Sequence, residues 1–188
     1  MNGRRIIDLD MTAEFLAALD PAGIFTFQAI GEAPGGGGNL NRVLHGTIEQ
    51  HVRELTDLNA AGAGIFVMVN EGNGLASPPA RTCRTNDNVV RVRSLFVDLD
   101  GAPLKPTLRA QVRPHMVIET SPGRWHTYWF GVPCPLEDFT AAQKALAERF
   151  GGDPAVCDLA RVMRLPGYFH LKKEPFQTRI VGPEELSQ

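Results

Sequence analysis

The sequence predicts an α+β fold in which most strands pair antiparallel. Helical and strand patterns alternate along the 188 residues without the regular β-α-β repeat of a doubly wound sheet. Two strand patterns are joined by Ser-Pro-Gly-Arg at 121–124, a composition typical of a hairpin turn. A chain of this length buries one sizeable core, so we expect one domain, 1–188, made from two sub-modules.

The first half of the chain contains two predicted helices and two predicted strands. Thr12 caps a helix over 12–20, which Asp20-Pro21 ends. Thr47 and Gln50 form a capping box that opens a second helix, ending at Gly62. Strands are expected over 24–30 and 64–70, and loops rich in small and polar residues over 31–42 and 71–88.

The second half is richer in strands. Strands are predicted over 89–100, 115–120, 125–131 and 176–181. An amphipathic helix over 137–151 ends at Gly151, and a short helical turn is expected over 158–163. The long loop at 71–88 divides the domain into an N-terminal αβ unit of about 1–75 and a second module of about 85–188.

Composition limits the class of protein. Apolar residues make up 43% of the chain and charged residues 21%, as in ordinary globular domains. The net charge of −2 means that nucleic-acid binding would need a local basic surface. Three cysteines without a CxxC pair, and five histidines without zinc-finger spacing, argue against a disulfide framework and a structural zinc. The sequence shows no signal peptide or membrane-length apolar run, so we expect a cytoplasmic protein without a membrane partner. A monomer is the default expectation.

Asp98 and Asp100 stand at the end of a strand pattern, with Leu99 between them. Side chains alternate along a strand, so both carboxylates point the same way, with their Cα atoms about 7 Å apart. Two like charges on one face are unfavourable unless a cation or a basic partner lies between them. The pair therefore either lies at a solvated strand end or holds a metal such as Mg²⁺.

A third carboxylate, Asp158, precedes Arg161 by one helical turn, and Arg164 follows shortly. An acid beside two arginines suits a metal and a phosphate, because guanidinium groups bind phosphate oxygens in a fixed fork. A surface ion pair on a helix explains the same spacing equally well.

His126 lies on an aromatic strand, with Tyr128 and Phe130 on its face and Trp125, Thr127 and Trp129 on the other. Such a histidine is more often a hydrogen-bonded core residue than a ligand. The preceding turn changes this interpretation, because Ser121, Arg124 and open backbone amides next to a histidine suit a triphosphate.

Other candidates are weaker. The four glycines at 35–38 lack the Lys-Ser/Thr ending of a P-loop and fit a plain loop. Lys172 and Lys173 could contact phosphates, although solvated charges are the usual explanation. Four arginines form a possible template-binding patch: Arg81, Arg84, Arg91 and Arg93.

Three segments, in this order, resemble the archaeo-eukaryotic primase (AEP) superfamily, specifically the RepB-like primases of plasmids and phages. They are "FVDLDG", "SPGRWHTYW" and "CDLARVMRLPG", and the resemblance covers residues 64–181. It implies a core with the active site in a cleft between an N-terminal αβ unit and an antiparallel module like an RNA-recognition fold. It also implies template-directed primer synthesis on single-stranded DNA from NTPs or dNTPs, in plasmid or phage replication.

The resemblance assigns roles to the candidate residues. Asp98, Asp100 and Asp158 would hold Mg²⁺ or Mn²⁺, and the triphosphate would be bound by Ser121, Arg124, His126, Arg161, Arg164 and Lys172. Two departures stand out. The residues after "RLPG" are "YFHLKK", where relatives carry a small residue and an asparagine before the lysine. The chain also lacks the zinc motif of cellular primases and the helical domain that often follows, so a helical accessory domain or a helicase is an expected partner.

Three alternatives remain open. An origin- or single-strand-binding module with an inactive site would share these motifs. A nucleotide-sugar glycosyltransferase also uses a DxD, but it would need a nucleoside-binding parallel sheet upstream. A rolling-circle nuclease needs paired histidines, and only His126 stands in "WHTYW".

Overall fold

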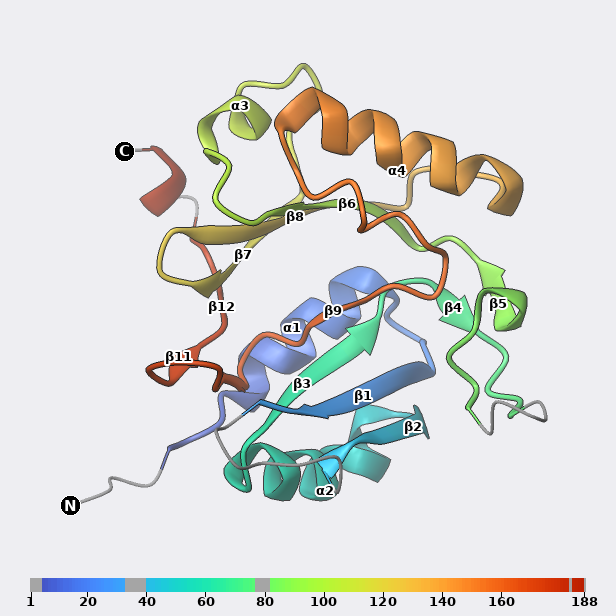
Figure 1. Cartoon of the computed structure of the whole chain (residues 1–188), viewed down its shortest axis with the longest axis vertical. Coiled ribbons are helices and arrows are strands. Elements are labelled where there is room, and N and C mark those ends of the chain that lie inside the picture. The colour runs from blue at the N-terminus through green and yellow to red at the C-terminus, as the bar shows by residue number, and fades with distance from the viewer. Residues whose placement is uncertain (1–4, 33–39, 77–81, 183, 188) are drawn as a thin grey trace.

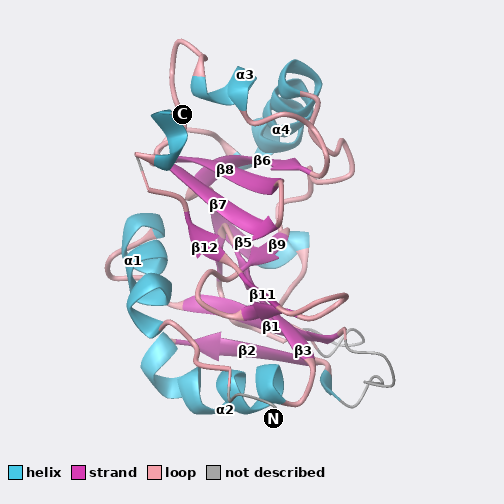
Figure 2. Cartoon of the chain, turned by 90° about the vertical axis from the view of Figure 1, so that its left-hand side faces the viewer, coloured by secondary structure: helices cyan, strands magenta, loops and turns pink. Residues whose placement is uncertain are grey.

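The computed structural model describes residues 5–32, 40–76, 82–182 and 184–187. Two four-stranded sheets lie one above the other, with helices on their outer faces (Figures 1 and 2). Every strand pairing in these residues is antiparallel. The predicted α+β class is therefore confirmed, and the parallel sheet that a glycosyltransferase would need is not found in the described part of the chain.

The first sheet has the strand order β2-β1-β3-β9. Its strands are β1 (Phe25–Gly31), β2 (Arg42–Gly46), β3 (Ala63–Met68) and β9 (Val162–Arg164). Helix α2 (Ile48–Ala60) covers the outer face and begins at the predicted capping box of Thr47 and Gln50. The expected helical turn over 158–163 is wrong in its second half, because Val162 and Met163 pair with β3 as a strand.

The second sheet has the order β12-β7-β8-β6. Its strands are β6 (Ser94–Leu99), β7 (Met116–Ser121), β8 (Arg124–Phe130) and β12 (Arg179–Ile180). Its outer face carries α3 (Lys105–Leu108) and α4 (Leu136–Phe150), which ends at Gly151 with φ 71°. The strand expected over 89–100 is two strands, since residues 92 and 93 separate β5 (Val89–Arg91) from β6.

Small elements complete the chain. Strand β5 pairs with β4 (Glu71–Gly72), and β10 (Phe169–His170) pairs with β11 (Phe176–Gln177). Among the described residues lie the short 3-10 helices η2 (Asn86–Asn88) and η3 (Glu185–Ser187). Among the described residues, we find no helix with the length and apolarity needed to cross a bilayer.

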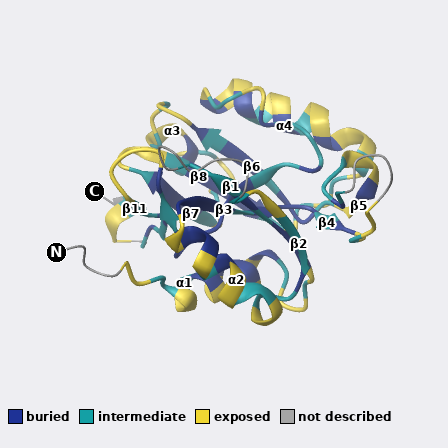
Figure 3. Ribbon diagram, turned by 60° about the horizontal axis from the view of Figure 1, so that its bottom comes forward, coloured by how far each residue is buried: buried dark blue, intermediate teal, exposed yellow. Residues whose placement is uncertain are grey.

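The main core lies between the two sheets and is closed on one side by α1 (Leu9–Leu19). Phe15 of α1 meets the ring of Tyr128 edge-on, with 5.2 Å between ring centroids. The side chain of Asp8, rather than the expected Thr12, caps α1 by accepting from the amide of Met11. Figure 3 shows the strands largely buried and the outward sides of α2 and α4 exposed.

The two faces of β8 separate as the alternation predicted. Tyr128 and Phe130 stack on the inner face, with ring centroids 5.8 Å apart. Trp129 points outward and stacks on Phe150 of α4 at the same centroid distance of 5.8 Å. His126 therefore faces the space between the sheets, whereas Trp125 faces the outer layer of helices.

The expected boundary at residues 75–85 separates strands β1–β3, which lie in the first sheet, from strands β6–β8, which lie in the second. Strand β9 does not follow this boundary. Strand β9 comes from the C-terminal part of the sequence and forms the edge of the first sheet. The main core also combines buried residues of both sheets, including Phe27, Ile65, Phe96 and Ile118. The two sub-modules are thus joined through a shared core and a strand that crosses between them.

Gln143 of α4 supports β6, the edge strand that carries Asp98. Its amide oxygen accepts from the backbone N–H of Phe96 at 3.1 Å, and its amide nitrogen donates to the carbonyl of Phe96 at 3.0 Å.

We expect Gln143→Leu to lower the free energy of unfolding by about 2–3 kcal/mol, because it leaves two buried backbone groups without these hydrogen bonds. Urea denaturation measures this loss, with the exposed neighbour change Lys144→Leu as control. An equal, small effect of both variants would contradict the assignment.

Candidate active site

The pairing of β6 with β8 brings the predicted acidic and basic residues together. Asp98 lies directly opposite His126 in the register, and a carboxylate oxygen of Asp98 is 3.8 Å from Nε2 of His126. Asp100, just beyond the strand, forms an ion pair with Arg124 at the start of β8. Both carboxylates therefore lie at the same end of the sheet, beside the turn that connects β7 to β8.

Asp98 is a partly buried acid among positive charges. Burial and the nearby charge of Asp153 raise the pKa of Asp98 to about 6. The charges of Arg164, Arg161 and Arg124 act in the opposite direction and favour the carboxylate. The backbone N–H of Asp153 also donates to the backbone carbonyl of Asp98 at 2.9 Å. Three arginines from two chain segments thus act on one carboxyl group.

His126 is buried and neutral. Burial, together with the charges of Arg164 and His170, lowers the pKa of His126 to about 3. Its Nδ1 lies 3.4 Å from the hydroxyl of Tyr128, and its Nε2 faces Asp98. The imidazole therefore adds no positive charge of its own near Asp98 and offers only uncharged ring nitrogens.

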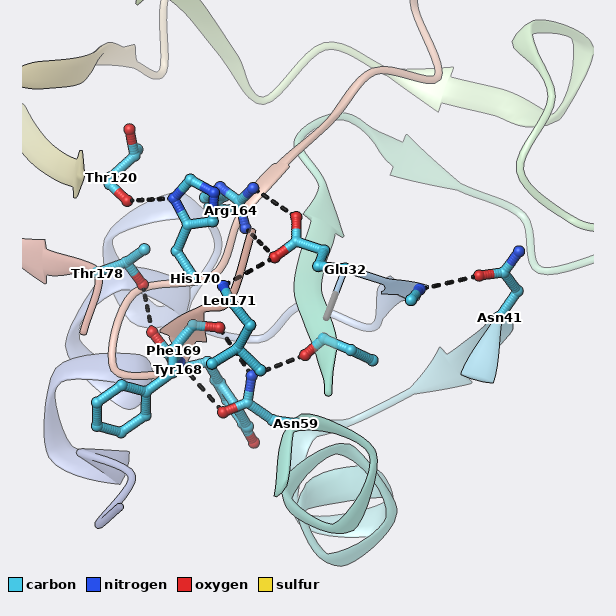
Figure 4. Close-up of polar contacts among 12 residues, drawn as sticks. Glu32, Asn41, Asn59, Thr120, Arg164, Tyr168, Phe169, His170, Leu171 and Thr178 are labelled. Carbon is cyan, nitrogen blue, oxygen red and sulfur yellow. Dashed lines mark hydrogen bonds and ion pairs between the residues drawn. The ribbon is translucent and has the colours of Figure 1, made fainter. Parts of the chain in front are cut away.

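A buried ion pair anchors Arg164 beneath this edge. The guanidinium of Arg164 donates to both carboxylate oxygens of Glu32, at 2.6 and 3.2 Å (Figure 4). The side chains of the two residues are only 9% and 1% exposed. Arg164 also lies over the ring of Phe66 at 4.7 Å from the centroid, and the amide of Leu171 donates to Glu32 at 3.1 Å. Arg164 is therefore held in one orientation.

His170 carries a buried nitrogen that lacks a hydrogen-bond partner. Its Nδ1 lies 2.9 Å from the carbonyl oxygen of Thr120, which only accepts, so Nδ1 carries the proton (Figure 4). Burial and the charge of Arg164 lower the pKa of His170, although the Thr120 bond and Glu32 oppose the shift. Its Nε2 is then an unprotonated acceptor, and in the described part of the chain it has no partner.

The segment "RLPGYFH" is fixed by hydrogen bonds from distant parts of the chain. Asn59 of α2 binds both the carbonyl and the amide of Phe169, at 2.8 and 3.2 Å. The hydroxyl of Thr178 lies within hydrogen-bond distance of two carbonyl oxygens, those of Leu165 at 2.9 Å and Tyr168 at 2.8 Å, and shares its one proton between them. Gly167 has φ 92°, and a Cβ there would lie 2.1 Å from the carbonyl oxygen of Asp8, so only glycine fits. These contacts hold Arg164 and His170 in place.

Asp158 does not join Asp98 and Asp100 in this structure. Its carboxylate pairs with Arg161, which also donates to the carbonyl of Ala155. Among the residues described, no three His, Cys, Asp or Glu side chains are arranged to hold one metal ion. The expected cluster of three carboxylates is therefore not formed.

The remaining predicted triphosphate residues lie around the same edge. Ser121 pairs with Arg124 across the hairpin turn. Lys172 is exposed, and its charge contributes to the lowered pKa of His170, which places it near that ring. Both residues are therefore within the neighbourhood that the sequence indicated, at its exposed rim.

The predicted template-binding arginines do not form one exposed patch. Arg93 is buried, with its side chain 1% exposed, and it binds Asp20 and the carbonyl of Ile24. Arg91 is exposed but pairs with both Asp20 and Glu71. Arg84 donates to the carbonyl of Ala160, and Arg81 lies outside the described residues. The side chain of Arg93 is therefore not accessible to a DNA strand.

The donor set at Asp98 and Asp100 fits a hard divalent cation. Mg²⁺ is commonly bound by one or two carboxylates, with substrate phosphates and water completing its shell. Asp98 is a partly buried acid that a cation would stabilise in its charged form. Two carboxylates are enough for such a site, so the separation of Asp158 does not exclude it.

Comparison with known proteins identifies the family. A family model described as "RepB DNA-primase N-terminal domain" matches residues 78–181, more than half of the chain. The chain belongs to this family. This RepB-primase domain contains all three recognised motifs within the matched residues. A search of the curated proteins finds no match.

Solved structures agree with this assignment in fold. The domain is similar to the AEP domain of the cyanophage S-2L primase-polymerase, with a TM-score of 0.70 and 21% identity, covering 96% of this chain and 93% of that one. It is also similar to primase RepB′, with a TM-score of 0.60 and 18% identity, covering 93% of this chain and 57% of that one. The catalytic domain of RepB′ in complex with initiator DNA gives a TM-score of 0.59 and 18% identity, over 94% and 87% of the two chains. The AEP-type fold is thus shown.

Sequence reasoning missed three residues of this site: Glu32, Asp153 and His170. Glu32 follows β1, far in sequence from the motifs, and only the pairing of β9 with β3 brings Arg164 to it. Asp153 lies in the connection after α4, and no local pattern marks it. His170 lies in the recognised segment after "RLPG", but no local pattern there marked it as part of the site.

We expect Glu32→Gln to lower the free energy of unfolding by about 3 kcal/mol at pH 7, because it leaves the buried Arg164 charge without its partner. Burial raises the pKa of Glu32, but Arg164 and the Leu171 amide outweigh it and lower the pKa below 4.5. This contribution is therefore complete above pH 4.5 and is lost as the pH falls through the lower folded-state pKa. Denaturation at pH 7 and at acidic pH measures it.

The exposed change Glu54→Gln on α2 is the matched control, since it removes the same charge without a buried partner. The difference between the two variants should be large at pH 7 and shrink in acid. A difference that does not depend on pH would contradict the role given to the Glu32 charge.

Proposed function

We propose that this RepB-primase domain is a metal-dependent nucleotidyltransferase that extends or initiates primers on a single-stranded DNA template. The observation that carries the proposal is the gathering of Asp98 and Asp100 with Arg124, Arg161 and Arg164 at one end of the second sheet. Carboxylates for a cation, surrounded by guanidinium groups for phosphate oxygens, are the arrangement that phosphoryl chemistry needs.

Asp98 and Asp100 would hold Mg²⁺ or Mn²⁺. Such an ion lowers the pKa of a primer 3′-hydroxyl and stabilises the pyrophosphate that leaves. Arg124 is paired with Asp100 and is exposed, so it is free to exchange that carboxylate for a phosphate oxygen. Asp158 would act through Arg161, its ion-pair partner, by setting the position of that guanidinium.

Arg164 and His126 would bind the triphosphate from below. Glu32 fixes the orientation of Arg164, so little conformational entropy is lost when a phosphate binds. His126 remains neutral, and a ring N–H can donate to a phosphate oxygen without competing with the cation. His170, Ser121 and Lys172 would complete the nucleotide site.

A single-strand-binding module without catalysis is the second candidate. The observation that favours it is the pairing of Asp100 with Arg124 and of Asp158 with Arg161, since paired acids are less available to a metal. The two candidates differ in one measurable property, which is nucleotide incorporation.

Primer extension tests the proposal. The protein is incubated with a single-stranded DNA template, labelled NTPs or dNTPs, and Mg²⁺ or Mn²⁺, with and without an annealed primer. We expect metal-dependent products, and a loss of at least about a hundredfold in Asp98→Asn/Asp100→Asn, because a catalytic metal contributes several kcal/mol. The control Asp57→Asn/Glu148→Gln removes two charges on the outward sides of α2 and α4 and should keep wild-type activity.

Products without a primer would add primase activity to polymerase activity. A folded protein that binds single strands but makes no product with either metal would overturn the catalytic proposal and favour the binding module.

Asp158→Asn separates two roles for the third acid. If Asp158 positions Arg161, we expect the variant to raise the KM for nucleotide while kcat changes little. Steady-state kinetics measures both. A fall in kcat as large as that of Asp98→Asn would contradict the positioning role and restore Asp158 as a metal ligand.

A further inference from the structure

A groove lies on the outer face of the second sheet, opposite His126. It encloses about 940 Å³ and is bordered by α3, the start of β8 and the C-terminal turn at η3. Figure 1 shows α3 and the C-terminal turn on the same side as the β7–β8 hairpin. A cavity of this volume is large enough for a small organic ligand or part of a polymer chain.

Positively charged side chains are concentrated in the groove, although the chain as a whole carries a net negative charge. Lys105, Arg109 and Arg113 line it, and all three are exposed. Within the described ranges, none of them forms an ion pair. The acidic side chain in the lining, Glu185, is already paired with Arg179. In a protein of net charge −2, this surface is locally basic and uncompensated.

An aromatic ring lies among these cations. Trp125 is partly exposed in the groove and packs against the apolar cluster of the outer layer, which includes Leu104. Bases of single-stranded nucleic acid stack on such rings while lysine and arginine bind the phosphates between them. An aromatic platform with three unpaired cations therefore fits a single strand better than it fits an apolar ligand.

The groove also adjoins the candidate active site. Trp125 directly follows Arg124, which is paired with Asp100. Lys105 follows Asp100 after only four intervening residues, which connect β6 to α3. A strand lying in the groove would therefore pass the end of the sheet at which both carboxylates stand.

We propose that this groove is the binding track for single-stranded DNA, with Trp125 stacking on a base and Lys105, Arg109 and Arg113 contacting phosphates. The inference rests on the proposed function, because it supplies the template surface that Arg91 and Arg93 do not. The contacts proposed in the groove do not involve the metal site. An experiment can therefore contradict the groove and leave the catalytic proposal standing, or the reverse.

Binding of fluorescein-labelled oligothymidylate, followed by anisotropy at several salt concentrations, tests the track. We expect Lys105→Glu/Arg109→Glu to weaken binding at least about tenfold and to lower the salt slope by about 1.4, since each lost phosphate contact contributes about 0.7. The control Arg53→Glu/Lys144→Glu makes the same change of charge on α2 and α4 and should bind within about twofold of wild type. Equally weakened oligothymidylate binding in both double variants would mean a general charge effect and would contradict the proposed binding track.

Tryptophan fluorescence gives a second readout that does not depend on charge. The chain has two tryptophans, and Trp129 is buried against Phe150. Oligothymidylate should quench wild-type emission but not that of Trp125→Phe, which keeps a stacking ring and the fold. Trp125→Ala should weaken binding by roughly five- to a hundredfold. Unchanged quenching in Trp125→Phe, or quenching by free dNTP but not by DNA, would overturn the assignment.

Primer extension separates the failure of the groove from the failure of the proposed function. Groove variants that bind DNA and extend primers as the control does would overturn the groove and leave the polymerase function standing. Groove variants that lose extension at low template concentration, and recover it at high template concentration, would support the track. A wild-type protein that binds the strand through Trp125 but never extends a primer would support the groove and contradict the catalytic proposal.

Discussion

The candidate site depends on the pairing of β9 with β3. This pairing carries the chain from the outer helix of the second sheet to the edge of the first, and it sets Arg164 opposite Phe66. Arg164 then meets Glu32, which would otherwise be a buried acid without a cation paired to it. The connection before β9 brings Asp153 and Arg161 near Asp98. Without this crossing, the second sheet would hold two aspartates and a histidine but only one of the three arginines.

Burial, together with neighbouring charges, explains why the same few residues show displaced pKa values. The site gathers three guanidinium groups and five carboxylates in surroundings that are partly closed to water. Burial therefore keeps His126 neutral and raises the pKa of Asp98, while Glu32 stays charged because its partner is fixed beside it. A cation with an anionic triphosphate would match this distribution, since the cation favours ionised Asp98 and the phosphates favour the arginines.

Local patterns predicted most of this fold, and long-range contacts account for what they missed. The capping box at Thr47, the alternation on β8 and the hairpin at 121–124 depend on neighbouring residues, and all three are confirmed. The pairing of β6 with β8, which places Asp98 opposite His126, is a longer-range contact that no local pattern predicted. Glu32 could not be found, because its role comes from a partner 132 residues away. Arg93 was misplaced because sequence cannot distinguish an exposed arginine from one buried against Asp20 and Phe25.

A crystal structure with Mn²⁺ and a non-hydrolysable dNTP is the most direct test of this account. The account predicts an anomalous peak between the carboxylates of Asp98 and Asp100, with triphosphate oxygens facing Arg164 and His126. It also predicts that the Asp100–Arg124 pair opens, because the cation replaces the guanidinium. A nucleotide bound with its metal away from this pair, or a site that stays empty at saturating Mn²⁺, would contradict the central claim.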